Sequence, residues 1–427
     1  MRRPAILALA AVLAAGAATV HLASSASAAA ACYPAWSSSA VYVGGGQASY
    51  QGVNYQAKWW TQNENPATHS GQWDVWANQG ACGGSTPPTT PPPTTPPPTT
   101  PPPTTTPPST PPPTTTPPPT TPPPTGNGQL PKHFLTGYWQ NFDNPAREIR
   151  LRDVPATYDL IAVAFADATN TPGTVSFSID PGLSASLGGY TDADFRNDVA
   201  TLHSRGKKVI ISVGGERGTI SVASSSAATN FANSIVGLIA SYGFDGVDID
   251  LENGVNATYM GQALRDIRNR TNPNLIITMA PQTIDMQSTG SQYFQLALSI
   301  KDILTVVHTQ YYNSGAMLGC DNNAAYAQGT VNFLVALACI QLENGLRPDQ
   351  VSLGLPAAPS AAGGGYVNPS VVNQALDCLA KGINCGSVKP PRTYPGIRGA
   401  MTWSVNWDVT NGNGFANTVR PHLNTLP

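Results

Sequence analysis

Charged residues are scarce in this chain of 427 residues. Only 11% of the residues are charged, and the formal net charge is -2 at pH 7. Nucleic-acid binding depends on clustered Lys and Arg that neutralise phosphates, so this composition argues against a nucleic-acid partner. A neutral substrate suits such a chain better than a polyanion.

Two further absences narrow the class of protein. None of the six cysteines has the Cys-x-x-Cys spacing of a zinc site, and no motif implies a metal or an organic cofactor. Beyond the N-terminal region, no apolar run is long enough to cross a bilayer. We therefore expect no cofactor and no membrane-spanning segment in the mature chain.

The N-terminus has the layout of a secretory signal peptide. Arg2 and Arg3 precede an apolar stretch over residues 5–20, and small residues follow up to a predicted cleavage site near Ala28. A membrane anchor is the alternative, but the stretch is rich in alanine and ends in small residues. We predict a signal peptide at 1–28 and a secreted, extracellular protein that acts as a monomer.

Cysteine placement agrees with an oxidising compartment, where disulfides persist. We expect pairs between cysteines that share a domain and lie close in sequence, although the connectivity of the last four remains open. The expected pairs are Cys32–Cys82, Cys320–Cys339 and Cys378–Cys385.

The prolines divide the chain into domains. Residues 85–125 are almost entirely Pro and Thr, a composition that cannot bury an apolar core and favours extended polyproline II. We predict a linker at 85–128 between a small domain at 31–84 and a large domain at 129–427.

The small domain has more aromatic rings than about fifty residues can bury, so some rings must be exposed. Exposed flat rings suit the apolar faces of sugars. The segment Ala57-Lys-Trp-Trp-Thr61, together with Trp36 and Trp76, resembles the chitin-binding modules of carbohydrate-binding families 5 and 12. The resemblance implies a small all-β fold in which Trp59 and Trp60 bind substrate, while Trp36 and Trp76 belong to the core.

In the large domain, short apolar runs alternate with amphipathic stretches. Thr191 and Asp194 predict the N-terminus of one helix through a reciprocal capping box. We expect helices at 192–204, 228–241, 259–269 and 331–344, and strands at 133–139, 158–165, 207–213, 243–252, 275–280, 303–312, 351–355 and 399–404. Eight strands with intervening helices favour an α/β fold of the (β/α)8 TIM-barrel class, and a doubly wound open sheet is the alternative.

The segment Asp245-Gly-Val-Asp-Ile-Asp-Leu-Glu252 places carboxylates at alternate positions of an apolar run. On a strand, Asp248, Asp250 and Glu252 share one face, because successive side chains point to opposite faces. Neighbouring carboxylates raise one another's pKa, so such a cluster is typical of acid/base chemistry or a metal site. An exposed strand edge with solvated acids is the alternative.

This segment matches the Asp-Gly-x-Asp-x-Asp-x-Glu signature of family 18 glycoside hydrolases, the chitinases. Further matches are Ser212-Val-Gly-Gly215, Met279-Ala-Pro281, Gln310-Tyr-Tyr-Asn313 and Trp403, which together cover most of residues 133–408. The resemblance implies a secreted enzyme that hydrolyses β-1,4 bonds in chitin and chito-oligosaccharides.

Glycoside hydrolysis needs an acid at the leaving oxygen and a group that reacts with or stabilises the anomeric carbon. Glu252 is the natural acid. Asp167 and Asp408 remain candidates for an ordinary second carboxylate, but neither belongs to a cluster.

The family resemblance implies a different nucleophile, the substrate's own acetamido oxygen, which forms an oxazolinium ion. Asp250 would then orient the acetamido group, Asp248 would share a proton with Asp250, and the Tyr312 hydroxyl would hold the acetamido oxygen. Trp403 would form the floor under the sugar. The resemblance also assigns Gln310, Met279, Tyr138 and Gly215 to the substrate pocket.

Only about forty residues separate Pro356 from Gly399, where some family members insert a domain that deepens the cleft. We therefore expect an open groove and mainly endo cleavage. Two other functions remain open: an endo-β-N-acetylglucosaminidase that acts on N-glycan cores, and a chitin lectin without catalysis. The attached module argues against the first, and Glu252 argues against the second.

Overall fold

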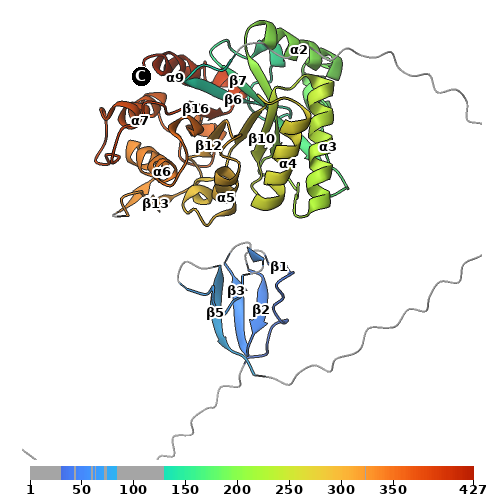
Figure 1. Cartoon of the computed structure of the whole chain (residues 1–427), viewed down its shortest axis with the longest axis vertical. Coiled ribbons are helices and arrows are strands. Elements are labelled where there is room, and N and C mark those ends of the chain that lie inside the picture. Colours follow the sequence, from blue (N-terminus) through green and yellow to red (C-terminus); the bar gives the residue numbers. More distant parts are fainter. Residues whose placement is uncertain are drawn as a thin grey trace, which may run out of the picture. The chain divides into compact units, whose positions relative to one another are not determined.

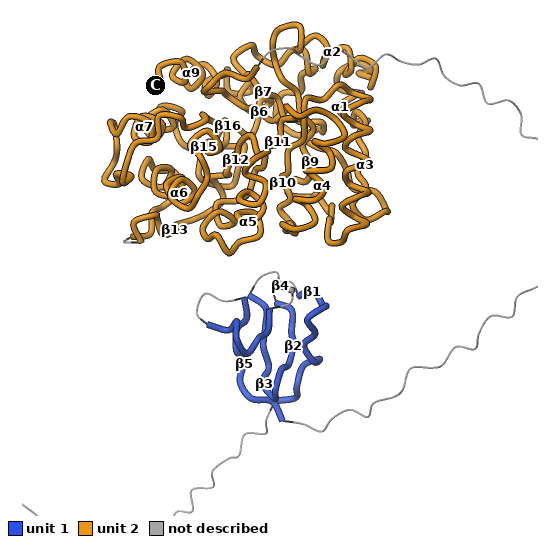
Figure 2. The backbone as a smooth tube through the Cα atoms, in the orientation of Figure 1, with its two compact units in different colours: residues 1–113 blue, residues 114–427 orange. Residues whose placement is uncertain are grey.

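The computed structural model describes residues 30–83, apart from 43–44, 59–60, 63 and 72–74, and residues 129–427, apart from 323. These residues form two compact units, one within 1–113 and one within 114–427, which we describe separately (Figure 2). The predicted signal peptide and linker lie outside the described residues, as do Trp59 and Trp60.

The small unit is an antiparallel β structure. Trp76 is fully buried at its centre, and Trp36 packs against the same cluster from a half-buried position, as predicted for both. One sheet has the order β2-β3-β5, and β1 pairs with β4. The strands are β1 Val41–Tyr42, β2 Gln47–Tyr50, β3 Val53–Ala57, β4 Thr61–Gln62 and β5 Trp76–Ala81.

The large unit is a closed barrel of eight parallel strands (Figure 1). Because β6 pairs with both β7 and β16, the sheet has no open edge, which excludes the doubly wound alternative. The predicted (β/α)8 barrel is confirmed. In spatial order the strands are β6 Phe134–Gln140, β7 Leu160–Ala168, β9 Lys208–Gly214, β10 Gly246–Asp250, β11 Ile276–Met279, β12 Val306–Gln310, β15 Val351–Pro356 and β16 Gly399–Trp403.

Helices cover the outside of the barrel, with α3 packed beside α4 (Figure 1). Helix α2 has the predicted bounds and capping box, in which Thr191 and Asp194 each bond the other's backbone N–H. None of the helices that the structure describes is long and apolar enough to cross a membrane. The helices are α1 Pro181–Ser186, α2 Asp192–Ser204, α3 Ser225–Tyr242, α4 Ala257–Arg270, α5 Gln292–Ser299, α6 Val331–Glu343, α7 Pro369–Lys381, α8 Val405–Thr410 and α9 Gly414–Leu423.

Several short elements lie between these helices and strands. A two-residue strand, β8, pairs antiparallel with the end of β7, and β13 and β14 form a hairpin after β12. The short elements are β8 Val175–Ser176, β13 Ala316–Leu318, β14 Ala325–Ala327, and the 3-10 helices η1 Leu151–Asp153, η2 Thr283–Met286, η3 Pro348–Gln350 and η4 Pro359–Ala361. Between β15 and β16, an interval that the structure describes in full, the chain forms only η4 and α7.

Strand β10 ends earlier than predicted, so the prediction that Glu252 ends this strand is wrong. The ladder with β9 stops at Asp250, and the ladder with β11 stops at Ile249. The backbone of Leu251 instead pairs with the side chain of Tyr293. Glu252 therefore lies in the loop that leads to α4. Strand β12 likewise stops at Gln310, two residues before Tyr312.

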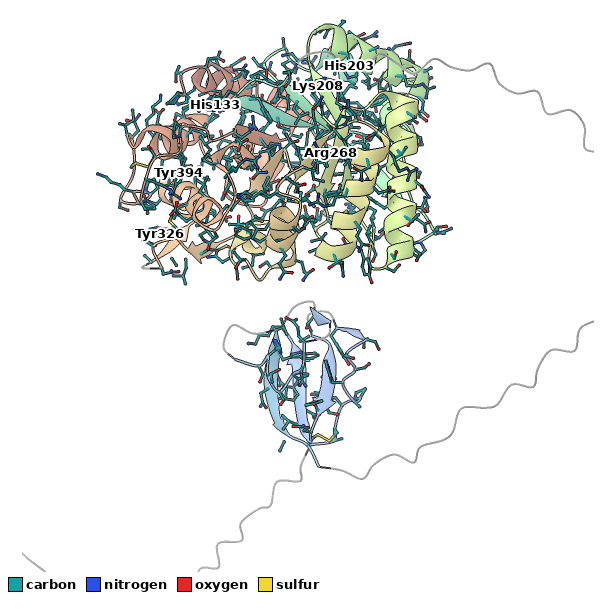
Figure 3. All side chains as sticks on the ribbon, viewed as in Figure 1. His133, His203, Lys208, Arg268, Tyr326 and Tyr394 are labelled. Atoms are coloured by element: carbon teal, nitrogen blue, oxygen red, sulfur yellow. A yellow bond between two sulfur atoms is a disulfide. The ribbon has the colours of Figure 1, made fainter. Side chains whose placement is uncertain are left out.

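The opposite end of β10 is held by polar contacts of Asp245. Its carboxylate lies 2.8 Å from His203 Nε2 and 3.0 Å from Lys208 Nζ, two residues labelled in Figure 3, and it accepts a hydrogen bond from the Val209 N–H. Asp245 thus joins α2, β9 and β10 at the amino ends of the strands, far along β10 from Asp250. The first acid of the segment is structural.

All three predicted disulfides are present. Cys32–Cys82 closes the small unit, Cys320–Cys339 ties the region of the β13–β14 hairpin to α6, and Cys378–Cys385 ties the end of α7 to the loop that follows.

Candidate active site

A cleft of about 1270 Å³ opens at the carboxyl ends of the barrel strands. Residues at or after the ends of all eight strands line it, which is where barrel enzymes build their sites. Of the residues predicted to form the site, the cleft walls include Asp250, Glu252, Tyr312, Trp403, Gln310 and Gly215.

Asp248 lies beneath this cleft in the barrel interior and is fully buried. Three hydroxyl groups donate hydrogen bonds to its carboxylate: Tyr138 at 2.7 Å, Ser212 at 2.6 Å and Thr278 at 2.6 Å. Burial raises the pKa of Asp248, and the three donors oppose that rise because they stabilise the charged form.

Asp250 follows on the same face of β10 and is 4% exposed. Its pKa is well above the ordinary value, first because of burial and then because of the charges of Asp248 and Glu252. A single amide, that of Gln310, donates to Asp250 Oδ1 at 2.9 Å. Since Asp248 has three donors and Asp250 has one, we infer that a proton shared by this pair resides mainly on Asp250.

Glu252 is half-buried at the cleft wall between two amide side chains. Gln310 Nε2 lies 3.4 Å from Oε1, and Gln282 Nε2 lies 3.3 Å from Oε2. Burial raises the pKa of Glu252, the two amides lower it, and the nearby charge of Glu216 raises it. The net rise favours a carboxyl that can hold a proton and release it to a bound group.

Tyr312, two residues after the end of β12, is buried and lines the cleft. Its pKa is well above the ordinary value because of burial and the charges of Asp250 and Glu252, so the phenol remains protonated. A protonated phenol can donate a hydrogen bond.

Trp403 at the end of β16 forms an aromatic floor. Its ring is stacked with Phe165 at a centroid distance of 5.8 Å and with Phe142 at 6.3 Å. Trp403 and both phenylalanines line the cleft. Stacked apolar faces of this kind suit a sugar ring.

Gly215 has the close approach that only glycine allows. Its N–H donates to the Asp250 carbonyl at 2.7 Å, its φ is +77°, and a Cβ would lie 2.5 Å from the Phe165 ring. The absence of a side chain leaves room for Phe165 against Trp403.

Two predicted pocket residues lie elsewhere. Met279 is fully buried in the core outside the barrel, because it pairs with Ile249, whose side chain faces the helices. Tyr138 points into the barrel but is only 1% exposed, since Trp403 and Phe165 pack against it. The prediction that both side chains line the pocket is wrong; Tyr138 contacts Asp248 instead.

Asp408 and Asp167, the two candidates for an ordinary second carboxylate, differ in whether they reach the cleft. Asp408 is fully buried and accepts bonds from the Tyr158 hydroxyl and from the backbone N–H groups of Phe415 and Ala416 at the start of α9. It therefore holds the fold together. Asp167 lines the cleft from the β7–β8 ladder, and burial and Asp180 raise its pKa.

Sequence reasoning missed Gln282, Asp285 and Trp407. Gln282 follows Met279-Ala-Pro281 directly, so the motif did point to its position, and Trp407 lies in α8, four residues after Trp403 at the end of β16. Asp285 carried no signal in the sequence, since it sits alone in η2. Burial and the charge of Glu252 raise its pKa to about 6.

Both units match known families. The model described as "Glycosyl hydrolases family 18" matches residues 135–416, and the model of carbohydrate-binding module family 5/12 matches residues 35–77. Chitinase Chi52 of Paenibacillus xylanexedens is 36% identical over 338 residues, which cover 70% of this chain and 63% of Chi52. Chitinase D of Niallia circulans is 36% identical over 340 residues, with the same two coverages of 70% and 63%. The chain thus spans less than two thirds of the length of these relatives.

Solved structures agree with this assignment of the barrel. A protein from Streptomyces coelicolor, described as a candidate chitinase A, is 65% identical with a TM-score of 0.67, covering 69% of this chain and 99% of its own. A family 18 chitinase from Chromobacterium violaceum is 31% identical with a TM-score of 0.64, covering 92% of this chain and 100% of its own.

Proposed function

The chain belongs to family 18 of the glycosyl hydrolases, and we propose that it is a secreted chitinase that cleaves β-1,4 bonds between N-acetylglucosamine units with retention of anomeric configuration. One observation carries the proposal. Asp248, Asp250 and Glu252 follow one another from the barrel interior into a cleft that also exposes a phenol and an aromatic floor.

Glu252 is the general acid. Its raised pKa favours the protonated carboxyl, and its position on the cleft wall gives it access to a glycosidic oxygen. As the bond between C1 and the leaving oxygen breaks, the proton of Glu252 moves to that oxygen. The resulting carboxylate then takes a proton from water in the second step.

As membership of family 18 implies, the substrate's acetamido oxygen is the nucleophile. It attacks C1 and forms an oxazolinium ion. Asp250 accepts a hydrogen bond from the acetamido N–H and thereby orients the acetamido group for this attack. Water then attacks C1 from the face that the leaving group vacated, which gives overall retention.

Three neighbours assist this chemistry. Asp248 keeps the shared proton on or near Asp250, the Tyr312 hydroxyl donates to the acetamido oxygen, and Trp403 supports the apolar face of the reacting sugar. Each role is supported by the contacts of these side chains within or directly below the cleft.

Cleavage is mainly endo. The interval between β15 and β16 forms only η4 and α7, so it adds no wall that would close the cleft around a chain end. Mixed long products at the earliest times on long soluble chains would agree with this mode. A product profile dominated by dimers at those times would contradict it.

The small unit binds chitin through Trp59 and Trp60, and it holds the enzyme on an insoluble surface. Its match to carbohydrate-binding module family 5/12 supports that role. Secretion is supported by the signal-peptide layout of residues 1–28 and by three disulfides.

Time-resolved proton NMR of chitohexaose digestion tests the reaction. We expect the β-anomer in the first products of the wild-type chain and no products from Glu252→Gln, which should still bind chitin. An initial α-anomer would contradict retention. Binding without hydrolysis by the wild-type chain would identify a lectin instead.

A further inference from the structure

Residue Leu251 sits at a gap in the barrel ladder. The two neighbouring strands stop pairing with β10 at Asp250 and Ile249, yet Leu251 is 2% exposed. A buried peptide without a strand partner must find other hydrogen bonds, because leaving its N–H and C=O unpaired away from water is unfavourable.

The phenol of Tyr293 on α5 fills this gap. Leu251 N–H donates to the Tyr293 oxygen at 2.6 Å, and the Tyr293 hydroxyl donates to Leu251 O at 3.2 Å. One side chain thus takes the place of a neighbouring strand on both groups of this residue. The next residue in the chain is Glu252, so this contact fixes the backbone from which the acid projects.

A second contact holds the far end of the same loop. Gln292, which precedes Tyr293 in α5, accepts a hydrogen bond from the Ala257 N–H at 3.0 Å through Oε1. Ala257 is the first residue of α4. Two successive residues of α5 therefore bind the loop on either side of Glu252.

A third contact reaches the carboxyl itself. Gln282 Nε2 donates to Glu252 Oε2 at 3.3 Å, and the Gln282 N–H donates to Asp285 Oδ2 at 3.1 Å. The Asp285 carboxylate thereby fixes the backbone of the residue that binds Glu252. Tyr293 does not line the cleft and is 3% exposed, so it acts on Glu252 without touching substrate.

Resting on the proposed role of Glu252 as the acid, we propose that residues 282–293 form a clamp that positions this acid, with Tyr293 as its main positioning residue. The clamp places the carboxyl against the leaving oxygen. Its loss should impair protonation of the leaving group far more than binding of the sugar chain.

Substrates with different leaving groups distinguish a residue that positions the acid from one that only stabilises the fold. A sugar alcohol needs a proton as it departs, whereas 2,4-dinitrophenolate does not. We compare kcat/KM because it reports the steps up to the first irreversible one, bond cleavage. The substrates are chitohexaose and 2,4-dinitrophenyl chitobioside, with the full chain as enzyme.

For Tyr293→Phe we expect kcat/KM on chitohexaose to fall about tenfold or more, and kcat/KM on the dinitrophenyl substrate to fall less than about threefold. The matched control is Tyr242→Phe. This variant also removes a buried phenol, which donates a hydrogen bond of 3.0 Å to the Phe177 carbonyl, and neither residue lines the cleft. Tyr242→Phe should change kcat/KM by the same factor on both substrates.

Equal losses on the two substrates for Tyr293→Phe, or no loss on either, would overturn the clamp. If Tyr293→Phe does not fold, Gln282→Met carries the same comparison at an exposed position. A wild-type chain that cleaves neither substrate would refute the proposed function, whereas an active wild type with equal losses in the variant would refute the clamp alone.

Discussion

Tyr138 and Asp248 meet across the barrel interior, where the phenol donates a hydrogen bond of 2.7 Å to Oδ2 of the carboxylate. The two residues are on β6 and β10, which are not neighbours in the sheet. Burial and the charges of Asp248 and Asp250 hold the pKa of Tyr138 well above its ordinary value, so the phenol always donates. This bond is one of the three that stabilise the charged form of Asp248 against the effect of burial.

Removal of that phenol should change the pH dependence of activity. In Tyr138→Phe, Asp248 loses one of three donors, and its pKa rises because the charged form is less stabilised. If activity needs a charged Asp248, the variant loses activity on acidification at a higher pH than the wild type does. We expect the acidic limb of the kcat profile to move up by about one pH unit.

Thr278→Val provides the matched comparison, since it removes the donor on Asp248 Oδ1. Its acidic limb should move in the same direction. An unchanged limb in both variants would show that the charge of Asp248 does not depend on these hydroxyls.

Asp285 should make the folded chain less stable as the pH rises through about 6. Burial and the charge of Glu252 raise its pKa from 3.8 to about 6, so the folded chain binds this proton more tightly than the unfolded chain. The resulting stability is fully present below pH 3.8 and is lost as the pH rises through about 6. The loss is at most about 3 kcal/mol.

Asp285→Asn keeps an oxygen that can accept from Gln282 N–H and has no charge. Its free energy of unfolding relative to wild type should therefore be higher at pH 7.5 than at pH 4.5. Denaturant unfolding at the two pH values measures this difference. A difference that is the same at both pH values would contradict the raised pKa.

Deletion of residues 31–125 should separate surface binding from chemistry. The tethered module raises the local concentration of the barrel on an insoluble polymer without changing its site. Activity on crystalline chitin should fall much more than activity on soluble chito-oligosaccharides. Initial rates on both substrates measure this, and equal losses would refute the division of labour.

Most of the barrel was predictable from local pattern. Apolar runs gave all eight strands within a few residues, and Thr191 with Asp194 gave the first residue of α2, because capping depends only on residues in the first turn. The errors were at strand ends. β10 and β12 stop where their neighbours stop pairing, and that depends on other strands.

The site was predictable in part for the same reason. Alternation on β10 places Asp248 and Asp250 on one face whatever surrounds them. Met279 was assigned to the wrong face because its orientation follows from its register with Ile249. Tyr138 was assigned to the pocket because its depth beneath Trp403 and Phe165 is not visible in its own strand.

The sequence by itself determined the carboxylates, their spacing, the aromatic end of β16 and the barrel class, since these follow from periodicity and from motifs within short segments. Tertiary structure alone decided which groups set the charges and positions of those carboxylates. Tyr138 lies 110 residues from Asp248, and Tyr293 lies 42 residues from Leu251. Hydrogen bonds across such separations form only when the closed barrel brings distant strands and helices together, because no local pattern encodes which partner a buried polar group meets.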